Sequence, residues 1–173
     1  MATMVIPTAA TAILPEFRTE AAITKRVLER VPGDKLTWKP HAKSMTLGQL
    51  AGHVAQIPGR ISKMAQQDSF DVLKGSFVPP QPESLEEILT GYEQSVHDAE
   101  QFLQGVTEES LRETWRLMKG DREVFTQPRG AVVRTIMLNH WYHHRGQLSV
   151  YLRLLNVALP VIYGRSADED PFA

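Results

Sequence analysis

The sequence predicts an all-α protein, a four-helix bundle with a small β-hairpin between its third and fourth helices. Two observations support this class. Four long segments repeat apolar residues every three or four positions, the spacing of one helix face, and their connections are short or medium in length. No internal repeat or low-complexity tract indicates another architecture. Four amphipathic helices with such connections pack most economically as a bundle.

The first predicted helix covers residues 11–31 and ends at Pro32-Gly33. Its buried face is predicted to consist of Leu14, Phe17, Ala21, Thr24, Leu28 and Val31. The second predicted helix covers residues 46–68, with Ser44 or Thr46 as its N-cap. Its apolar face, called its stripe below, consists of Leu47, Leu50, Val54, Ile57, Ile61 and Met64. Because Pro58-Gly59 lies inside that stripe, we expect a kink or a break near residue 57.

The third predicted helix covers residues 84–104, where Ser84 and Glu87 have the spacing of a capping box. Its stripe is Leu85, Ile88, Tyr92, Val96, Ala99 and Leu103. In residues 113–127, Gly120-Asp121 separates two short apolar-containing runs, which suggests a hairpin. The fourth predicted helix covers residues 130–155, and a polar-ended tail follows over residues 156–173.

Length and composition narrow the possible functions. The 173 residues, 42% of them hydrophobic, predict a single domain over residues 1–173. The chain has 19 Lys+Arg and 20 Asp+Glu, so its net charge is close to zero. We therefore expect no overall electrostatic attraction to nucleic acid or to anionic lipid. Cysteine is absent, which leaves His, Asp and Glu for metal or acid–base chemistry. The N-terminus lacks a basic region and no run of 18 apolar residues occurs, so we expect a cytoplasmic protein without a membrane partner.

The stretch LNHWYHHRGQLSVYLRLL, residues 138–155, contains three histidines within five positions. At ~3.6 residues per turn, His140 and His144 fall in the middle of an apolar sector, and His143 falls toward its edge. That sector comprises Val133, Ile136, Met137, His140, His144, Gln147, Leu148 and Tyr151. Side chains at i and i+4 lie one above the other, ~6 Å apart along the axis, so two imidazoles can converge on one ion.

Two neutral imidazoles buried in an apolar stripe would cost about 1–3 kcal/mol each if unpaired. Hydrogen bonds to neighbouring helices or a trapped water could satisfy them, and so could a metal ion at ~2.0–2.1 Å from each ring. The metal alternative requires a third ligand from another helix. His53 lies on the flank of the second stripe and either turns inward or keeps its tip in solvent. We expect His41 and His97 at the surface.

His53 in LGQLAGHVAQIPGR, the run NHWYHHRGQLSVYLRLLNV and the tail LPVIYGRSADED resemble the DinB/YfiT-like family of metalloproteins. The resemblance extends from about Glu16 to Asp170 and is most specific in HxxxHRGQ and the tail. It implies a four-helix bundle, often a homodimer, in which three histidines bind a divalent ion such as zinc or nickel. Those ligands would here be His53, His140 and His144.

The resemblance leaves the activity open, because related proteins with known activities are thiol-dependent transferases or isomerases of small electrophiles. The family name refers to DNA-damage induction, yet no basic stripe interleaved with aromatic residues occurs here, so we expect no nucleic-acid partner. Three histidine ligands leave a coordination position open, as in catalytic zinc sites. An ion there can lower the pKa of bound water to about 7, or bind a thiol as thiolate.

These considerations predict a divalent-metal-dependent enzyme, transferase-like or hydrolase-like, acting on an unidentified small molecule. Two alternatives stay open: a non-catalytic, stress-associated dimeric bundle that binds metal, and a helical interaction protein whose histidines are ordinary core residues. No catalytic residue can be assigned, although Tyr142, His143 and Gln147 are possible auxiliary groups. Arg145 is expected to point away from the stripe and to pair with an acid or cap a loop. Candidate hydrogen-bond partners of the metal-bound rings are Glu20, Glu93 and Glu100.

Overall fold

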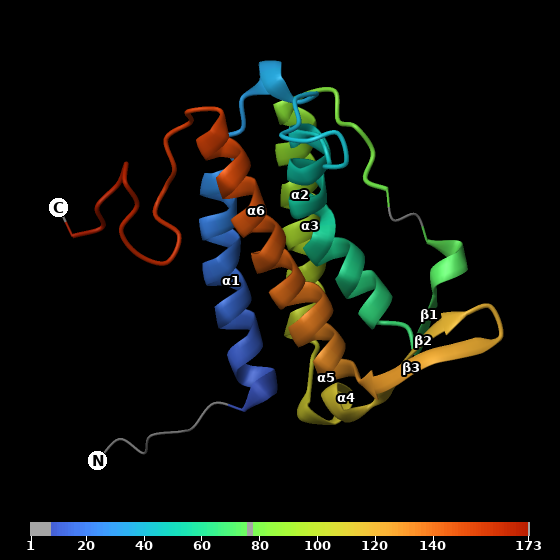
Figure 1. Ribbon diagram of the computed structural model, residues 1–173. Coiled ribbons are helices and arrows are strands. Elements are labelled where there is room, and N and C mark those ends of the chain that lie inside the picture. Colours follow the sequence, from blue (N-terminus) through green and yellow to red (C-terminus); the bar gives the residue numbers. More distant parts are fainter. Residues whose placement is uncertain (1–7, 76–77, 173) are drawn as a thin grey trace, which may run out of the picture.

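The computed structural model confirms the predicted helical bundle with a small β element (Figure 1). The structure describes residues 8–75 and 78–172. Residues 1–7 and 173 of the predicted domain lie outside the described residues, as do residues 76 and 77. The long helices are α1 (Ala9–Leu28), α2 (Leu47–Ala65), α3 (Leu85–Gln104) and α6 (His140–Leu154). Shorter segments are η1 (Gly33–Lys35), η2 (Val72–Lys74), α4 (Glu108–Arg112), α5 (Arg129–Val132) and the π-helical η3 (Val133–Asn139).

The predicted apolar stripes meet in one core. Figure 1 shows α6 between α1 and α2, with α3 behind them. Residues of all four helices are fully buried there, among them Phe17, Leu28, Leu50, Val54, Ala99, Trp141 and Leu148. Within the described residues, no helix has both the length and the apolar character needed to cross a bilayer.

Side chains at the helix N-termini explain where the helices begin. Thr46 caps α2, and its hydroxyl and the Gln49 side chain form a reciprocal capping box. At α3, the Ser84 hydroxyl accepts from the Glu87 N–H at 3.1 Å, as predicted. The Glu87 carboxylate, however, accepts from the Glu83 N–H, so the predicted box is only half formed.

We expected a kink or a break near residue 57, and helix α2 is continuous through Pro58, so a break does not occur. Proline has no N–H to offer the carbonyl four residues earlier, which is that of Val54. That carbonyl instead accepts a 2.8 Å hydrogen bond from the indole N–H of Trp141. Gly59 brings α2 close to α3, since its N–H donates to the Ser95 hydroxyl at 2.8 Å. The Pro58-Gly59 pair therefore serves two interhelical contacts.

The fourth predicted helix departs from a regular α-helix in its first half. Residues Val133–Asn139 form a π-helix, whose i→i+5 hydrogen bonds add one residue to a turn. The extra residue in this turn fits the burial pattern. Val132 and Val133 are fully buried, and so are Met137 and Leu138, which follow them by five residues each. Regular α-geometry resumes at His140.

The predicted hairpin is present and forms part of a three-stranded sheet. Strands β2 (Thr114–Lys119) and β3 (Arg122–Pro128) pair antiparallel. Gly120 adopts a φ of 58° at the turn, a conformation that glycine adopts at little cost. The additional strand β1 (Ser69–Asp71) pairs parallel with β2 and was not predicted. The sheet lies next to the C-terminal end of α2 (Figure 1).

Candidate metal centre

Three of the six histidines come together between α2 and α6. His53 extends from α2, and His140 and His144 extend from α6. One ring nitrogen of each lies within 4.8 Å of the others, and the ring centroids are 4.5–5.3 Å apart. All three rings are half-buried. Within the described residues, this is the one cluster of three or more His, Asp or Glu side chains close enough to hold a metal ion.

Trp141 fixes the face of α6 that carries the histidines. Its indole stacks on Phe17 of α1 with the ring centroids 5.5 Å apart, while its N–H binds the Val54 carbonyl of α2. Val54 directly follows His53 in α2, and Trp141 directly follows His140 in α6. The hydrogen bond between these two neighbours therefore sets the register in which the imidazoles of the two helices meet.

Arg145 anchors the other side of α6 to α1. Its guanidinium is 1% exposed and forms a 2.6 Å ion pair with Glu20. It also donates to the Thr24 hydroxyl at 3.0 Å and to the Tyr163 hydroxyl of the C-terminal segment. The expectation that Arg145 points away from the histidine stripe and pairs with an acid agrees with this contact. Its nearly complete burial was not foreseen.

The outer ring nitrogens have partners, whereas the inner nitrogens face one another. His144 Nδ1 lies 2.7 Å from Gln147 Oε1, which can only accept, so this nitrogen carries the proton. The His140 ring hydrogen-bonds to the main chain of Ile136, an interaction that favours its protonated form. The ring is therefore the donor in that bond. The Nε2 atoms of His140 and His144 lie 2.8 Å apart. In two neutral rings with protons on the outer nitrogens, these inner atoms present lone pairs to each other, an arrangement that a shared cation stabilises.

The electrostatics of the cluster favour neutral rings. Burial, together with the neighbouring His144, His140 and Arg60, lowers the pKa of His53 to about 4. Burial also lowers the pKa of His140 and that of His144. Histidine binds metal in its neutral form, so at neutral pH protons compete little for these ring nitrogens.

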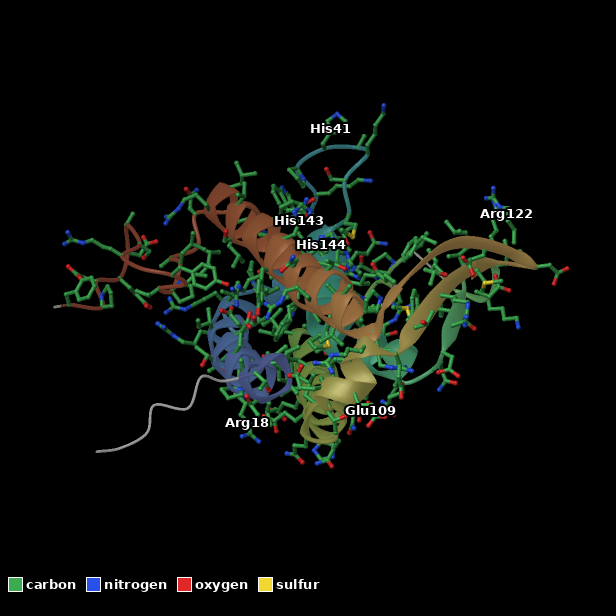
Figure 2. The ribbon with its side chains drawn as sticks, turned by 90° about the horizontal axis from the view of Figure 1, so that it is seen from below. Arg18, His41, Glu109, Arg122, His143 and His144 are labelled. Atoms are coloured by element: carbon green, nitrogen blue, oxygen red, sulfur yellow. The ribbon has the colours of Figure 1, made fainter. Side chains whose placement is uncertain are left out.

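The other predicted candidates are distributed around the molecule. His41 and His97 are exposed, as expected, and Figure 2 shows His41 on a loop that projects from the bundle. His143, which was placed toward the edge of the apolar sector, is also exposed. The three candidate acids pair with cations and not with the imidazoles; these pairs are Glu20–Arg145, Lys25–Glu93 and Arg18–Glu100. Of the possible auxiliary groups, Gln147 and His143 both contact His144, and the centroids of the two imidazole rings lie 4.9 Å apart. The Tyr142 hydroxyl donates to Glu16 instead.

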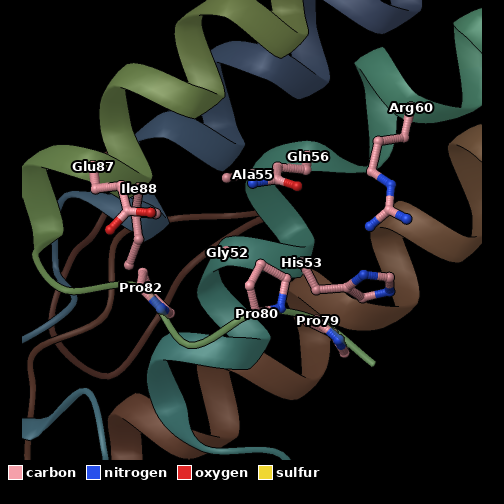
Figure 3. Close-up of a pocket in the computed structure, with 10 residues that line it drawn as sticks. All are labelled: Gly52, His53, Ala55, Gln56, Arg60, Pro79, Pro80, Pro82, Glu87 and Ile88. Atoms are coloured by element: carbon pink, nitrogen blue, oxygen red, sulfur yellow. The ribbon is translucent and has the colours of Figure 1, made fainter. Parts of the chain in front are cut away.

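A cavity of about 320 Å³ adjoins the cluster and is lined by His53 and His140. Arg60 also lines it, and sequence reasoning missed this residue. A signal was available, because Arg60 follows His53 by seven residues, which places both on one face of α2. Figure 3 shows the Arg60 side chain extending toward the His53 ring. The smaller pocket in Figure 3, about 20 Å³ and walled by Pro79 and Pro80, has room for about one water.

Comparisons with known proteins agree on one family. The sequence model of the DinB family matches residues 4–170. The chain is 26% identical over 157 residues to the uncharacterised protein YrdA of Bacillus subtilis, covering 90% of this chain and 89% of the relative.

Solved structures share the fold. A DinB-like protein from Bacillus cereus is 23% identical with a TM-score of 0.68, covering 87% of this chain and 95% of that one. The DinB-like protein YjoA from Bacillus subtilis is 19% identical with a TM-score of 0.66, covering 86% and 95%.

Proposed function

This chain belongs to the DinB family, and on that basis we propose that it binds a divalent metal ion through His53, His140 and His144. We propose further that the site serves an enzyme, transferase-like or hydrolase-like, acting on a small molecule. The observation that carries the proposal is the 2.8 Å approach of the two Nε2 atoms on α6, with His53 facing both rings. Ligand atoms within 4.8 Å of one another suit an ion whose bonds to imidazole are ~2.0–2.1 Å long.

The donor set limits which ion fits. Three neutral imidazoles suit first-row metals, and zinc or nickel are the two ions that the family resemblance implies. An ion held by three protein ligands would keep a position at which water or a thiol loses its proton near neutral pH. The chain's own residues hold the rings in place: Gln147 fixes the His144 tautomer, and the Ile136 main chain fixes His140. Such outer partners orient ligands and raise their affinity for metal.

An alternative function is a non-catalytic, stress-associated bundle in which the ion mainly stabilises the fold. It is supported by the position of the histidines, since an ion shared by His53 and the two α6 residues would cross-link two long helices. The enzyme is favoured by the cavity that reaches His53 and His140, because a purely structural ion needs no adjoining space.

We also propose that the protein is a cytoplasmic homodimer, as the family resemblance implies. Val150 and Leu154, one turn apart on α6, are 57% and 56% exposed and form an apolar pair that a second copy would cover. Light scattering of the purified protein tests this part of the proposal independently of metal content.

Elemental analysis of untagged protein tests the metal site. We expect about one zinc or nickel ion per chain in the native protein and a loss of most of it in His53→Ala, His140→Ala and His144→Ala. The exposed His41→Ala and His97→Ala variants are matched controls and should keep their metal. Retention of the same metal by both α6 ligand variants would refute the assignment.

A further inference from the structure

The cavity beside the histidine cluster has the dimensions and the walls of a small-molecule site. Its volume of about 320 Å³ is at the lower end of the range for ligand pockets, about 300–1,000 Å³. Its lining comes mainly from α2 and the β-sheet, with further residues from η2, η3 and α6, although no sheet residue had been predicted to take part. These walls are mainly apolar, with side chains that include Ile57, Ile61, Met64, Phe70, Leu117 and Phe125.

Among the described residues that line this cavity, one side chain is charged, and its charge is positive. Arg60 supplies a guanidinium, and among the described residues that line the cavity none is acidic. His53 and His140 line the same cavity. Arg60 and His53 are two turns apart on the same face of α2, so the positive charge lies next to the histidine cluster. In a mostly apolar cavity such a charge favours an anion, and a guanidinium suits a carboxylate in particular.

We propose that this cavity binds a small organic anion with an apolar body. The negatively charged group lies between Arg60 and the imidazoles of His53 and His140, and the apolar body extends toward Phe70, Leu117 and Phe125. The inference rests on the proposed function, because it places the anionic end of the ligand at the three-histidine site. It adds a substrate class, and it assigns Arg60 as a binding residue.

Calorimetric titration with octanoate and with 1-octanol tests the role of charge, since the two probes share an eight-carbon chain and differ in the head group. The proteins are the zinc-loaded native chain, Arg60→Gln and Lys63→Gln. Lys63 is a matched control because it lies on α2, is exposed and pairs with Asp98 away from the cavity. We expect Arg60→Gln to weaken octanoate binding at least tenfold and to leave octanol binding nearly unchanged. Lys63→Gln should match the native protein in both titrations.

The position of the probe is tested with carbon-13 methyl signals of methionine. Met64 lines the cavity, whereas Met45 precedes α2 and lies outside it. Octanoate should shift the Met64 signal, assigned from Met64→Leu, and leave the Met45 signal in place. An unshifted Met64 signal, equal octanoate affinity in all three proteins, or an equal loss of octanol affinity in Arg60→Gln would each overturn the inference.

The two proposals fail in distinguishable ways. Metal content, measured in the same samples, reports on the three-histidine site, and the octanoate ratio between Arg60→Gln and Lys63→Gln reports on the anion site. Arg60 is a cation beside His53, so its removal should not reduce the bound metal. A native protein that binds zinc but shows no Arg60-dependent preference for octanoate would contradict the anion site alone.

Discussion

At the residue scale, Gln147 has the clearest auxiliary role at the candidate metal centre. Its Oε1 atom accepts from His144 Nδ1 at 2.7 Å and so leaves Nε2 free to bind metal. We predict that Gln147→Met lowers zinc affinity about 10–100-fold, the usual effect of removing such a partner, while all three ligands remain. Competition with a chromophoric chelator measures the change. Gln104→Met, an exposed position at the end of α3, is the control, and equal affinities of the two variants would exclude this role.

A second residue-scale prediction concerns the buried ion pair of Arg145 and Glu20. Removal of one partner from such a pair typically costs about 3–5 kcal/mol, because the other charge stays buried without compensation. Arg145→Met should therefore lower the free energy of unfolding by about that amount, measured by urea denaturation of chelator-treated protein. The double variant Glu20→Leu/Arg145→Met should recover part of the loss. A single variant within about 1 kcal/mol of the native protein would show that the pair contributes little.

Sequence reasoning found part of the centre for a definite physical reason. The i,i+4 spacing of His140 and His144 is a local property of one helix, so helical periodicity alone predicts that they converge. His53 lies 87 residues before His140, and only the family resemblance favoured it over a boundary position. The burial of Arg145 depends on Glu20 and Tyr163, which local periodicity cannot bring together.

At the element scale, the contact between α2 and α3 depends on the absence of a side chain at Gly59. A Cβ atom there would lie 2.8 Å from Ser95 Cα, and backbone cannot move aside as a flexible side chain can. We predict that Gly59→Ala costs about 1–3 kcal/mol, as overpacking does. Gly91→Ala in α3 has no atom within 4 Å of its Cβ and should stabilise the protein by about 0.5–1 kcal/mol. Thermal unfolding should show opposite shifts; shifts of the same sign would contradict this account.

The elements that were predicted well from the sequence are those whose sequence signals come from residues close together in the chain. Caps such as Thr46 and Ser84 and the Gly120 turn act within a few residues, so three helices and the hairpin are found near their predicted bounds. Strand β1 has only three residues and exists through its pairing with β2, about 45 positions later in the chain. The π-helical stretch before His140 likewise depends on how its apolar side chains pack against other elements, which a fixed helical period does not represent.

At the scale of the whole molecule, two sides of the bundle differ. The histidine cluster lies between α2 and α6, and its cavity is lined by residues of α2, η3, α6 and the sheet. The C-terminal segment lies on the other side of α1 and α6 in Figure 1. There Glu169 pairs with Arg26 and Arg30, and Asp168 pairs with Arg153. Sequence reasoning assigned this segment as a polar-ended tail that resembles the family pattern. It did not predict the ion pairs of Glu169, because Arg26 and Arg30 lie 143 and 139 positions earlier in the chain.

The docking of this segment should be sensitive to acid. The Val161 N–H, together with Arg26 and Arg30, lowers the pKa of Glu169, and Arg153, together with the Leu159 N–H, lowers that of Asp168. A carboxylate whose pKa is lower in the folded state stabilises the fold above its ordinary pKa, about 4.3 for Glu and 3.9 for Asp. That contribution is lost as the pH falls through the lower folded value. The segment should therefore stay docked at pH 5 and detach only below about pH 4.

Amide NMR signals of Val161 and Leu159 measure this transition, since these N–H groups donate to Glu169 and Asp168 at 3.0 and 2.9 Å. Both signals should titrate with midpoints below the ordinary carboxyl values. Glu169→Gln should abolish the Val161 titration and leave that of Leu159, because each amide reports on its own carboxylate. A Val161 midpoint at or above about 4.3, or an unchanged titration in Glu169→Gln, would mean that these ion pairs do not hold the segment to α1.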